Sequence, residues 1–579
     1  MARQSPGASS TVIRLALVRL VFFVFMGVLI LRLYGLQVGA RKFYSDLAAG
    51  QHDLLAQLLP ERGEVAVQDP LSDGLYPVAA NLTLSLVYAV PSEMADAEYT
   101  ATVLAPVLAL DQAELAAKFS KIDDPFEPIK HAVSDELASE VTALQLAGIN
   151  LAPEAVRHYL GGDDYGQIIG FVGFVGDVRQ GQYGIEQYWE EALAGVQGEL
   201  KVEKEAGGGI IALGEREVKP AVDGADIVLT IDKNIQSRAC AAIQRAVEKH
   251  GAVSGSVVIM EPATGAVRAM CGSPNFDANN YAAAADPSVY GNEVVSAAYE
   301  PGSVFKPITM AAALEAKAVT PDTTYEDTGE VRIGPNTIRN SDLKAHGVQT
   351  MTGVLQESLN TGAIFAMRKV GVENFRETVA EFGFGQLTGI ELPNERAGDI
   401  STLAEKNEIY AATASFGQGI TVTPLQLTAA FGAIANRGRL MKPYIVQEVR
   451  YADGRKQITT PATIKQTISA ETATTLAAMM VQVVEGGHGK RAGVPGYYVA
   501  GKTGTAQVPY ADRAGYDPSK TIGTFAGFAP VDKPRFVMAV RINEPKDVVF
   551  AESSAAPVFG ELAKFLLEYY QVPPQREVK

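Results

Sequence analysis

The sequence predicts an α+β domain for residues 221–579, in which helices surround one antiparallel five-stranded sheet. Two observations carry this prediction. Strand patterns with turn signals occur at both ends of this stretch, and its middle, roughly residues 300–490, reads as mainly helical. The whole chain of 579 residues is too long for one core, so two or three domains are expected.

The composition is ordinary for globular protein, with 47% hydrophobic and 20% charged residues. The net charge of −16 argues against nucleic-acid binding, because such proteins present a basic footprint. Six scattered histidines and two cysteines show no metal-ligand spacing, so no metal site and no cofactor are expected. One disulfide between Cys240 and Cys271 is compatible with the sequence, but two free, partly buried thiols are favoured.

The N-terminal part predicts a single membrane-spanning helix at residues 15–38, after a cytoplasmic tail at residues 1–14. Arg19 and Arg32 bracket an uncharged centre and can reach the two headgroup regions. That centre has 12 residues, fewer than the ~18 of a typical span. A cleaved signal peptide is the alternative, and Arg32 disfavours it.

Residues 39–220 mix short helical and strand patterns and predict a mixed α/β spacer or docking domain, here called the pedestal. Ser134 to Leu146 reads as a helix with a serine cap, and Tyr188 to Leu193 as another short helix. Ile168 to Phe174 reads as a strand or turn, and Gly207 to Gly209 as a loop. None of these segments carries a chemical constellation.

Residues 221–579 begin with a helix at Ile235 to Val247 and end with a helix at Val558 to Tyr570 that is expected to pack on the sheet. The strands expected to form that sheet are 256–260, 266–270, 498–500, 524–528 and 536–540.

The most informative stretch is Glu300 to Pro307. Its Pro-Gly pair ends the preceding element, and an Ala-rich run after it predicts a helix, so Ser303 lies near a helix N-terminus. Lys306 follows three residues later on the same face, which provides a serine nucleophile with a neighbouring base. Serine is also a common helix cap, so this run alone is compatible with a structural role. A second Ser-x-x-Lys run, Ser341 to Lys344, is interpreted as a loop.

Two further runs follow Ser303. Ser358-Leu359-Asn360 ends an apolar run, and Lys502-Thr503-Gly504 lies at the end of a strand. Each is weak alone. All three in this order, each in suitable local structure, predict one cleft around the Ser303 hydroxyl.

These three runs resemble the transpeptidase domain of penicillin-binding proteins, the serine acyl-transferase fold shared with β-lactamases. Further stretches resemble the class B group, and the resemblance covers nearly the whole chain: Arg32–Gln37, Arg62-Gly63, Arg157–Tyr159, Gly170–Gly173, Gly184–Glu186, Ser273–Asp277, Asn280-Tyr281, Phe382–Gly385, Ser415–Gln426 and Ala555–Phe559. The pedestal departs from the family pattern, because only Asp69 remains of its usual Asp-Arg-Asn-Gly turn and Leu160 stands where a proline is common.

The resemblance implies that Ser303 attacks a peptide carbonyl and forms an acyl-enzyme. Lys306 would take its proton, with burial or the nearby cation Lys502 keeping that amine neutral. Ser358 would relay a proton to the leaving amine. Asn360 would hold Lys306 and the substrate backbone.

The same resemblance implies a binding strand. Lys502, Thr503 and Thr505 would bind a terminal carboxylate, and the missing side chain of Gly504 would let an extended peptide lie beside the strand. The backbone N–H groups of Ser303 and Thr505 would form the oxyanion hole.

The implied donor is a peptidoglycan stem peptide ending in D-Ala-D-Ala, the acceptor is an amine on a neighbouring stem, and β-lactams would acylate Ser303. The implied location is the cell membrane, with one span, the catalytic domain outside the cytoplasm, and a SEDS-family glycosyltransferase as partner. Two alternatives stay open. One is a D,D-carboxypeptidase or β-lactamase-like hydrolase that uses Glu391 or Glu395 as its base, and the other is a catalytically silent scaffold. The sequence does not decide between division and elongation.

Overall fold

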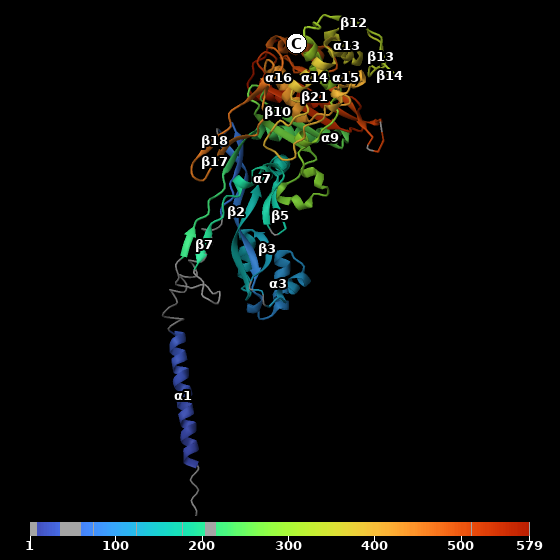
Figure 1. Ribbon diagram of the computed structural model, residues 1–579. Helices are drawn as coiled ribbons and strands as arrows, with labels where there is room; N and C mark the ends of the chain where they lie inside the picture. Colours follow the sequence, from blue (N-terminus) through green and yellow to red (C-terminus); the bar gives the residue numbers. More distant parts are fainter. Residues whose placement is uncertain are drawn as a thin grey trace, which may run out of the picture. The chain divides into compact units, whose positions relative to one another are not determined.

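The computed structural model describes residues 8–34, 60–72, 74–122, 124, 126–176, 178–202, 216–510, 512–513 and 515–577 (Figure 1). The chain forms two compact units. One is built from the segments 1–61 and 195–223, and the other from 62–194 and 224–579.

The first unit contains helix α1 (Ala8–Tyr34) and an antiparallel pair of strands, β7 (Glu199–Val202) and β8 (Arg216–Lys219). Among the described residues, no helix has the length and sustained apolarity that a membrane crossing requires. The predicted span therefore stays a prediction. Residues 1–7 of the predicted tail, residues 35–38 of the predicted span and the Gly207–Gly209 loop lie outside the described residues.

The second unit begins with the pedestal residues, which form most of a seven-stranded sheet in the order β18-β17-β9-β1-β2-β3, with β4 pairing β2. Its strands are β1 (Val65–Asp69), β2 (Gly74–Ala89), β3 (Glu127–Val133), β4 (Ile149–Tyr159), β9 (Asp226–Asp232), β17 (Val446–Arg450) and β18 (Lys456–Ile458). Helices α3 (Ala97–Leu108), α4 (Gln112–Phe119) and α5 (Asp135–Ala143) share a buried cluster with β2 and β3.

Two pedestal predictions are confirmed and one is partly wrong. The Ser134 hydroxyl caps α5, and the predicted helix near Tyr188 consists of α7 (Gly184–Tyr188) and α8 (Glu190–Leu193), which meet at Trp189. The segment from Ile168, predicted as a strand or turn, forms a strand only from β5 (Phe171–Val175) on, which pairs with β6 (Val178–Gln182). Its first residues belong to α6 (Gly166–Ile169), because Gly170 with φ 76° ends the helix before the strand starts.

A buried carboxylate joins three of the short pedestal runs noted in the sequence. Glu186 is fully buried and accepts hydrogen bonds from Arg62 Nε at 2.7 Å, Arg157 Nε at 2.8 Å and the Tyr159 hydroxyl at 3.3 Å. Arg62 also donates to Glu190. A buried charge is tolerated only when it is paired. The three runs must therefore come together in the fold for the Glu186 carboxylate to be paired.

The predicted five-stranded sheet is confirmed, with every neighbouring pair antiparallel in the order β11-β10-β22-β21-β20. Its strands are β10 (Ser254–Met260), β11 (Val267–Ser273), β20 (Ala500–Pro509), β21 (Tyr516–Ala529) and β22 (Phe536–Asn543). The strand predicted at 498–500 begins only at Ala500, so the Lys502-Thr503-Gly504 run lies within β20 and the predicted position at a strand end is wrong. The predicted flanking helices, α9 (Lys233–His250) and α18 (Ala555–Tyr569), pack together in one buried cluster with this sheet.

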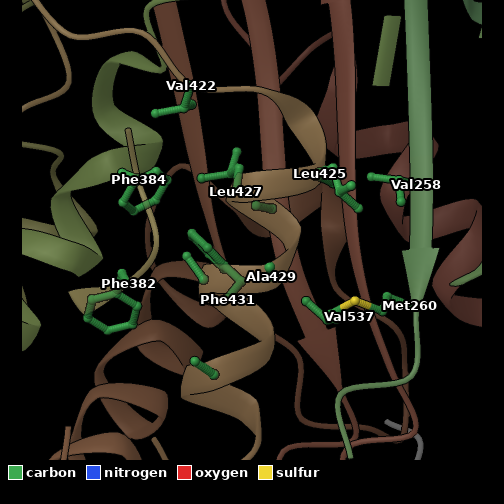
Figure 2. Packing of buried hydrophobic residues seen from close by; sticks show 14 of the residues in the cluster. Val258, Met260, Phe382, Phe384, Val422, Leu425, Leu427, Ala429, Phe431 and Val537 are labelled. Carbon is green, nitrogen blue, oxygen red and sulfur yellow. The ribbon is translucent and has the colours of Figure 1, made fainter. Parts of the chain in front are cut away.

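A second and larger core contains α16 (Pro424–Ala435) together with sheet residues. Figure 2 shows α16 with Val258, Met260 and Val537 of the sheet on one side and Phe382 and Phe384 on the other. The Ala-rich α11 (Lys306–Glu315) belongs to the same core, so the chain that follows Ser303 is anchored in buried apolar surface.

The middle of the chain is mainly helical, as predicted. Besides α11 and α16, its helices are α10 (Glu293–Ser296), α12 (Met351–Gln356), α13 (Asn360–Val370), α14 (Val372–Glu381), α15 (Glu408–Ala414) and α17 (Ala470–Glu485). Short strand pairs lie between them: β12 (Thr324–Asp327) with β15 (Gly347–Thr350), β13 (Glu330–Ile333) with β14 (Asn336–Arg339), and β16 (Arg439–Met441) with β19 (Thr463–Gln466).

The favoured interpretation of the cysteines is wrong. Cys240 of α9 and Cys271 of β11 form a disulfide, with their Cα atoms 5.3 Å apart. The two residues are 31 positions apart, and only the packing of α9 against β11 brings them within bridging distance.

Candidate active site

Ser303 lies in a single 3₁₀ turn, Gly302–Phe305, that runs directly into α11, so the predicted position at a helix N-terminus is confirmed. Gly302 has φ 60°, a left-handed conformation that costs glycine little. Its N–H donates to the Gly417 carbonyl at 2.9 Å. A side chain at Gly302 would also come within 2.9 Å of the Thr505 carbonyl, so this turn lies against β20.

Gly504 makes the same contact from the side of the strand. A Cβ atom there would lie 2.7 Å from the Pro301 carbonyl oxygen and 2.8 Å from the Val304 nitrogen. These two residues flank Ser303 closely, so the Lys502-Thr503-Gly504 run lies beside the candidate nucleophile. The missing side chain at Gly504 is required by this internal contact, a role beyond the substrate binding expected from the sequence.

Ser358 joins the two lysines. Lys306 Nζ donates to the carbonyl oxygen of Ser358 and to its Oγ, the latter at 3.3 Å. Lys502 Nζ donates to the same Oγ at 2.9 Å. The lysine side chains are 1% and 0% exposed, so one hydroxyl bridges two amines inside the protein.

Burial lowers the pKa of both amines, and the charge of Lys502 also acts on Lys306. Burial, together with the nearby charge of Lys502, lowers the pKa of Lys306 well below its ordinary value. Burial lowers the pKa of Lys502 to about 7. A buried amine that is neutral near physiological pH can accept a proton, which an exposed lysine cannot do there.

The remaining predicted site residues lie around this centre. Lys502 Nζ also donates to the Thr503 carbonyl at 3.0 Å and to its hydroxyl at 3.3 Å. The Thr505 hydroxyl accepts the Ala551 N–H at 3.0 Å. Within the described chain, the Ser303 hydroxyl makes no side-chain hydrogen bond.

Asn360 differs from the expectation. Its side chain donates to the Arg339 carbonyl at 2.9 Å, and the hydrogen bonds of Lys306 go to Ser358. The cause is Arg339, the last residue of β14, whose carbonyl lies beside the start of α13 and accepts the hydrogen bond of the Asn360 amide.

Sequence reasoning gave no role to Glu300, which follows the buried Tyr299. The Glu300 carboxylate accepts the Gly419 N–H at 3.0 Å and the Tyr516 hydroxyl at 3.0 and 3.1 Å. Burial raises the pKa of Glu300 despite these hydrogen bonds. A carboxylate next to a buried turn was the available signal, but Tyr516 is 216 positions away and no local pattern could identify it.

The competing sequence candidates have structural roles. Ser341 to Lys344 is a loop, as predicted, and Asp342 accepts the Lys344 N–H. Glu391 accepts the Ile445 N–H at 3.0 Å, and Glu395 accepts the N–H groups of Thr388 and Gly389.

Comparison with known proteins identifies the two domains. Residues 255–564 match the penicillin-binding protein transpeptidase domain, and residues 59–229 match the penicillin-binding protein dimerisation domain. The chain is 32% identical to stage V sporulation protein D of Bacillus subtilis, covering 96% of this chain and 86% of that protein. It is 30% identical to the probable peptidoglycan D,D-transpeptidase PbpC of Pseudomonas aeruginosa, covering 94% of each.

Two solved structures are also similar to this chain. Penicillin-binding protein 3 of Mycobacterium tuberculosis in complex with aztreonam matches with a TM-score of 0.70 and 27% identity, over 90% of this chain and 98% of that one. A peptidoglycan synthetase from Bifidobacterium adolescentis matches with a TM-score of 0.70 and 26% identity, over 90% and 97%. The chain therefore belongs to the class B penicillin-binding proteins, with a transpeptidase domain and a dimerisation domain.

Proposed function

We propose that this protein is a membrane-anchored D,D-transpeptidase that cross-links peptidoglycan stem peptides through an acyl-enzyme on Ser303. The observation that carries the proposal is the Ser358 hydroxyl, which accepts hydrogen bonds from two buried lysines beside the Ser303 turn. The proposed catalytic domain is residues 221–579, with residues 39–220 as its pedestal.

In the acylation step, Ser303 Oγ attacks the carbonyl of the penultimate D-alanine and its proton passes to neutral Lys306. The backbone N–H groups of Ser303 and Thr505 stabilise the oxyanion. The amine of the terminal D-alanine then leaves with a proton delivered through Ser358, and an ester on Ser303 remains. An acceptor amine attacks this ester by the reverse route, forms the new amide and frees the serine.

The substrate's terminal carboxylate would meet Lys502, Thr503 and Thr505. A charge-assisted hydrogen bond from Lys502 is the strongest of these contacts, and it requires a protonated amine. Asn360 is proposed to contact the substrate backbone after its amide leaves the Arg339 carbonyl. No cofactor takes part in this chemistry.

The relatives support the same substrates. Several are named peptidoglycan D,D-transpeptidases, and the Mycobacterium tuberculosis structures contain aztreonam and ampicillin. Because a β-lactam presents a strained amide and a carboxylate in place of the D-Ala-D-Ala end, it would acylate Ser303 in the same way.

Membrane anchoring is supported by the exposed apolar side chains of α1, which include Leu20, Phe22, Phe23 and Phe25. Helix α1 would hold the protein in the cell membrane, with its catalytic domain outside the cytoplasm and a SEDS-family glycosyltransferase as partner. Recovery of the full chain in the soluble fraction after membrane sedimentation would contradict the anchor.

The test of the activity uses the purified protein, a stem pentapeptide ending in D-Ala-D-Ala and a primary amine acceptor. We expect released D-alanine to match the amount of cross-linked product, and neither to form with Ser303→Ala. Free tetrapeptide as the main product would assign the protein to the carboxypeptidases. A wild-type protein that neither releases D-alanine nor binds a fluorescent penicillin would be a scaffold.

A further inference from the structure

Helix α13 begins directly after Ser358-Leu359, and Leu359 at its N-cap position has no side chain that can form a hydrogen bond. The first N–H groups of a helix have no partner within the helix. Here the N–H groups of Asn360 and Thr361 donate to Oδ1 of Asn340, at 3.0 and 3.2 Å. A residue 20 positions away in sequence from Asn360 therefore caps the helix that carries the Ser-x-Asn run.

Asp327 orients this cap. Its carboxylate accepts Asn340 Nδ2 at 2.9 Å and the Thr361 hydroxyl at 2.7 Å. Because a carboxylate only accepts hydrogen bonds, the Asn340 amide must turn its nitrogen to Asp327 and its oxygen to α13. Asp327 and Asn340 are each 2% exposed, so water does not compete for these positions.

The charge on Asp327 is maintained by its donors. Burial alone would raise its pKa, but hydrogen bonds from Thr361, from the N–H groups of Gly329 and His346 and from Asn340 bring the pKa of Asp327 below its ordinary value. Asp327 is therefore an ionised carboxylate at neutral pH. In that state it fixes the orientation of the Asn340 amide.

Ser358 needs such support. It has φ 56°, a left-handed conformation that non-glycine residues rarely adopt and keep only where the surroundings fix it. Its carbonyl accepts from Lys306, and its hydroxyl accepts from Lys306 and Lys502. Two residues later, Asn340 fixes the chain at Asn360. A shift in this cap would therefore displace the Ser358 hydroxyl from its position between the two amines.

We propose that Asp327 and Asn340 are positioning residues that hold the Ser358 hydroxyl between Lys306 and Lys502 for proton transfer. This proposal rests on the proposed function, in which Ser303 is acylated. Neither residue would touch the substrate. Their effect would reach the reaction only through the start of α13.

The first variant to test is Asn340→Asp, which places two carboxylates against each other, where both cannot remain charged without repulsion. We expect the second-order rate constant for acylation by a fluorescent penicillin to fall at least tenfold. The pH profile of that rate should also move, because Ser358 would no longer join the two amines, and loss of stability alone would not move it.

A swap variant, Asp327→Asn with Asn340→Asp, restores one amide and one carboxylate at the pair. Its second-order rate constant for acylation should be within tenfold of the wild-type value. The matched control is Asn336→Asp on the neighbouring strand β14, which is exposed and should acylate at the wild-type rate. Melting temperatures establish that each variant is folded.

An Asn340→Asp variant with the wild-type rate and pH profile would overturn the proposal. If that variant does not fold, the swap decides, and a loss of more than tenfold in the folded swap variant would overturn it. A wild-type protein that is not acylated at all would instead refute the proposed function, so the two failures are distinguishable.

Discussion

At the scale of single residues, the site depends on two lysine amines that differ in protonation. Lys306 must be neutral to accept the Ser303 proton, and Lys502 must be charged to bind a carboxylate. Burial lowers both pKa values, and the charge of Lys502 lowers that of Lys306 further. The proposed mechanism therefore requires one proton on the pair, held by Lys502.

This protonation state predicts the pH dependence of acylation. The second-order rate constant for penicillin should fall as the pH drops through the depressed pKa of Lys306, because the base gains a proton. It should also fall above about pH 7, where Lys502 loses its proton. Stopped-flow measurement of acylation between pH 5 and 9 checks both limbs.

Lys502→Arg is the control for the alkaline limb, because a guanidinium stays charged over this range. Its rate should be lower at the optimum but should not fall above about pH 7. An alkaline limb that persists unchanged in this variant would assign that limb to another group.

At the scale of elements, the site depends on the contact between strand β20 and the turn that carries Ser303. Gly302 and Gly504 meet across this contact, each where a Cβ atom would press on backbone of the other element. Backbone cannot rotate away as a flexible side chain can, so a methyl group here must separate the strand from the turn.

Gly504→Ala should therefore lower acylation about 10²-fold, because a displacement of about 1 Å at a reacting group can cost that much. The measurement is the second-order rate constant with a fluorescent penicillin, alongside the melting temperature. Gly291→Ala is a matched control, since its nearest neighbouring atom would lie at 3.5 Å. A wild-type rate in Gly504→Ala would contradict the contact as described.

Elements with local signals could be predicted from the sequence, and contacts between distant segments could not. Four of the five strands follow from short strand patterns next to turn residues, and the helix after Ser303 follows from its Ala-rich run. The Asn340 cap and the Glu300–Tyr516 hydrogen bonds join residues that no periodicity relates. The family resemblance implied that Asn360 holds Lys306, but the Asn360 amide donates a hydrogen bond to the Arg339 carbonyl.

At the scale of the whole molecule, the disulfide is the covalent tie between α9 and β11, the sheet edge opposite to β20. Cys240→Ser with Cys271→Ser should lower the free energy of unfolding by about 3–4 kcal/mol, because a loop of this length loses that much closure entropy on cross-linking. Denaturant titration with and without reductant measures the change.

Penicillin acylation of the folded Cys240→Ser, Cys271→Ser protein should stay at the wild-type rate, since β11 lies at the far edge of the sheet from β20. Equal unfolding free energies for the wild type with and without reductant would contradict the disulfide. This covalent link was also beyond prediction, because two isolated cysteines carry no information on their distance in the fold.

The central claim is that three runs far apart in the sequence form one cleft around the Ser303 hydroxyl. Its most direct test is the mass of the intact protein after penicillin treatment, followed by peptide mapping of the adduct. The account predicts one adduct, on the peptide that contains Ser303, and none in Ser303→Ala. An adduct on another residue, or one that persists in Ser303→Ala, would contradict it.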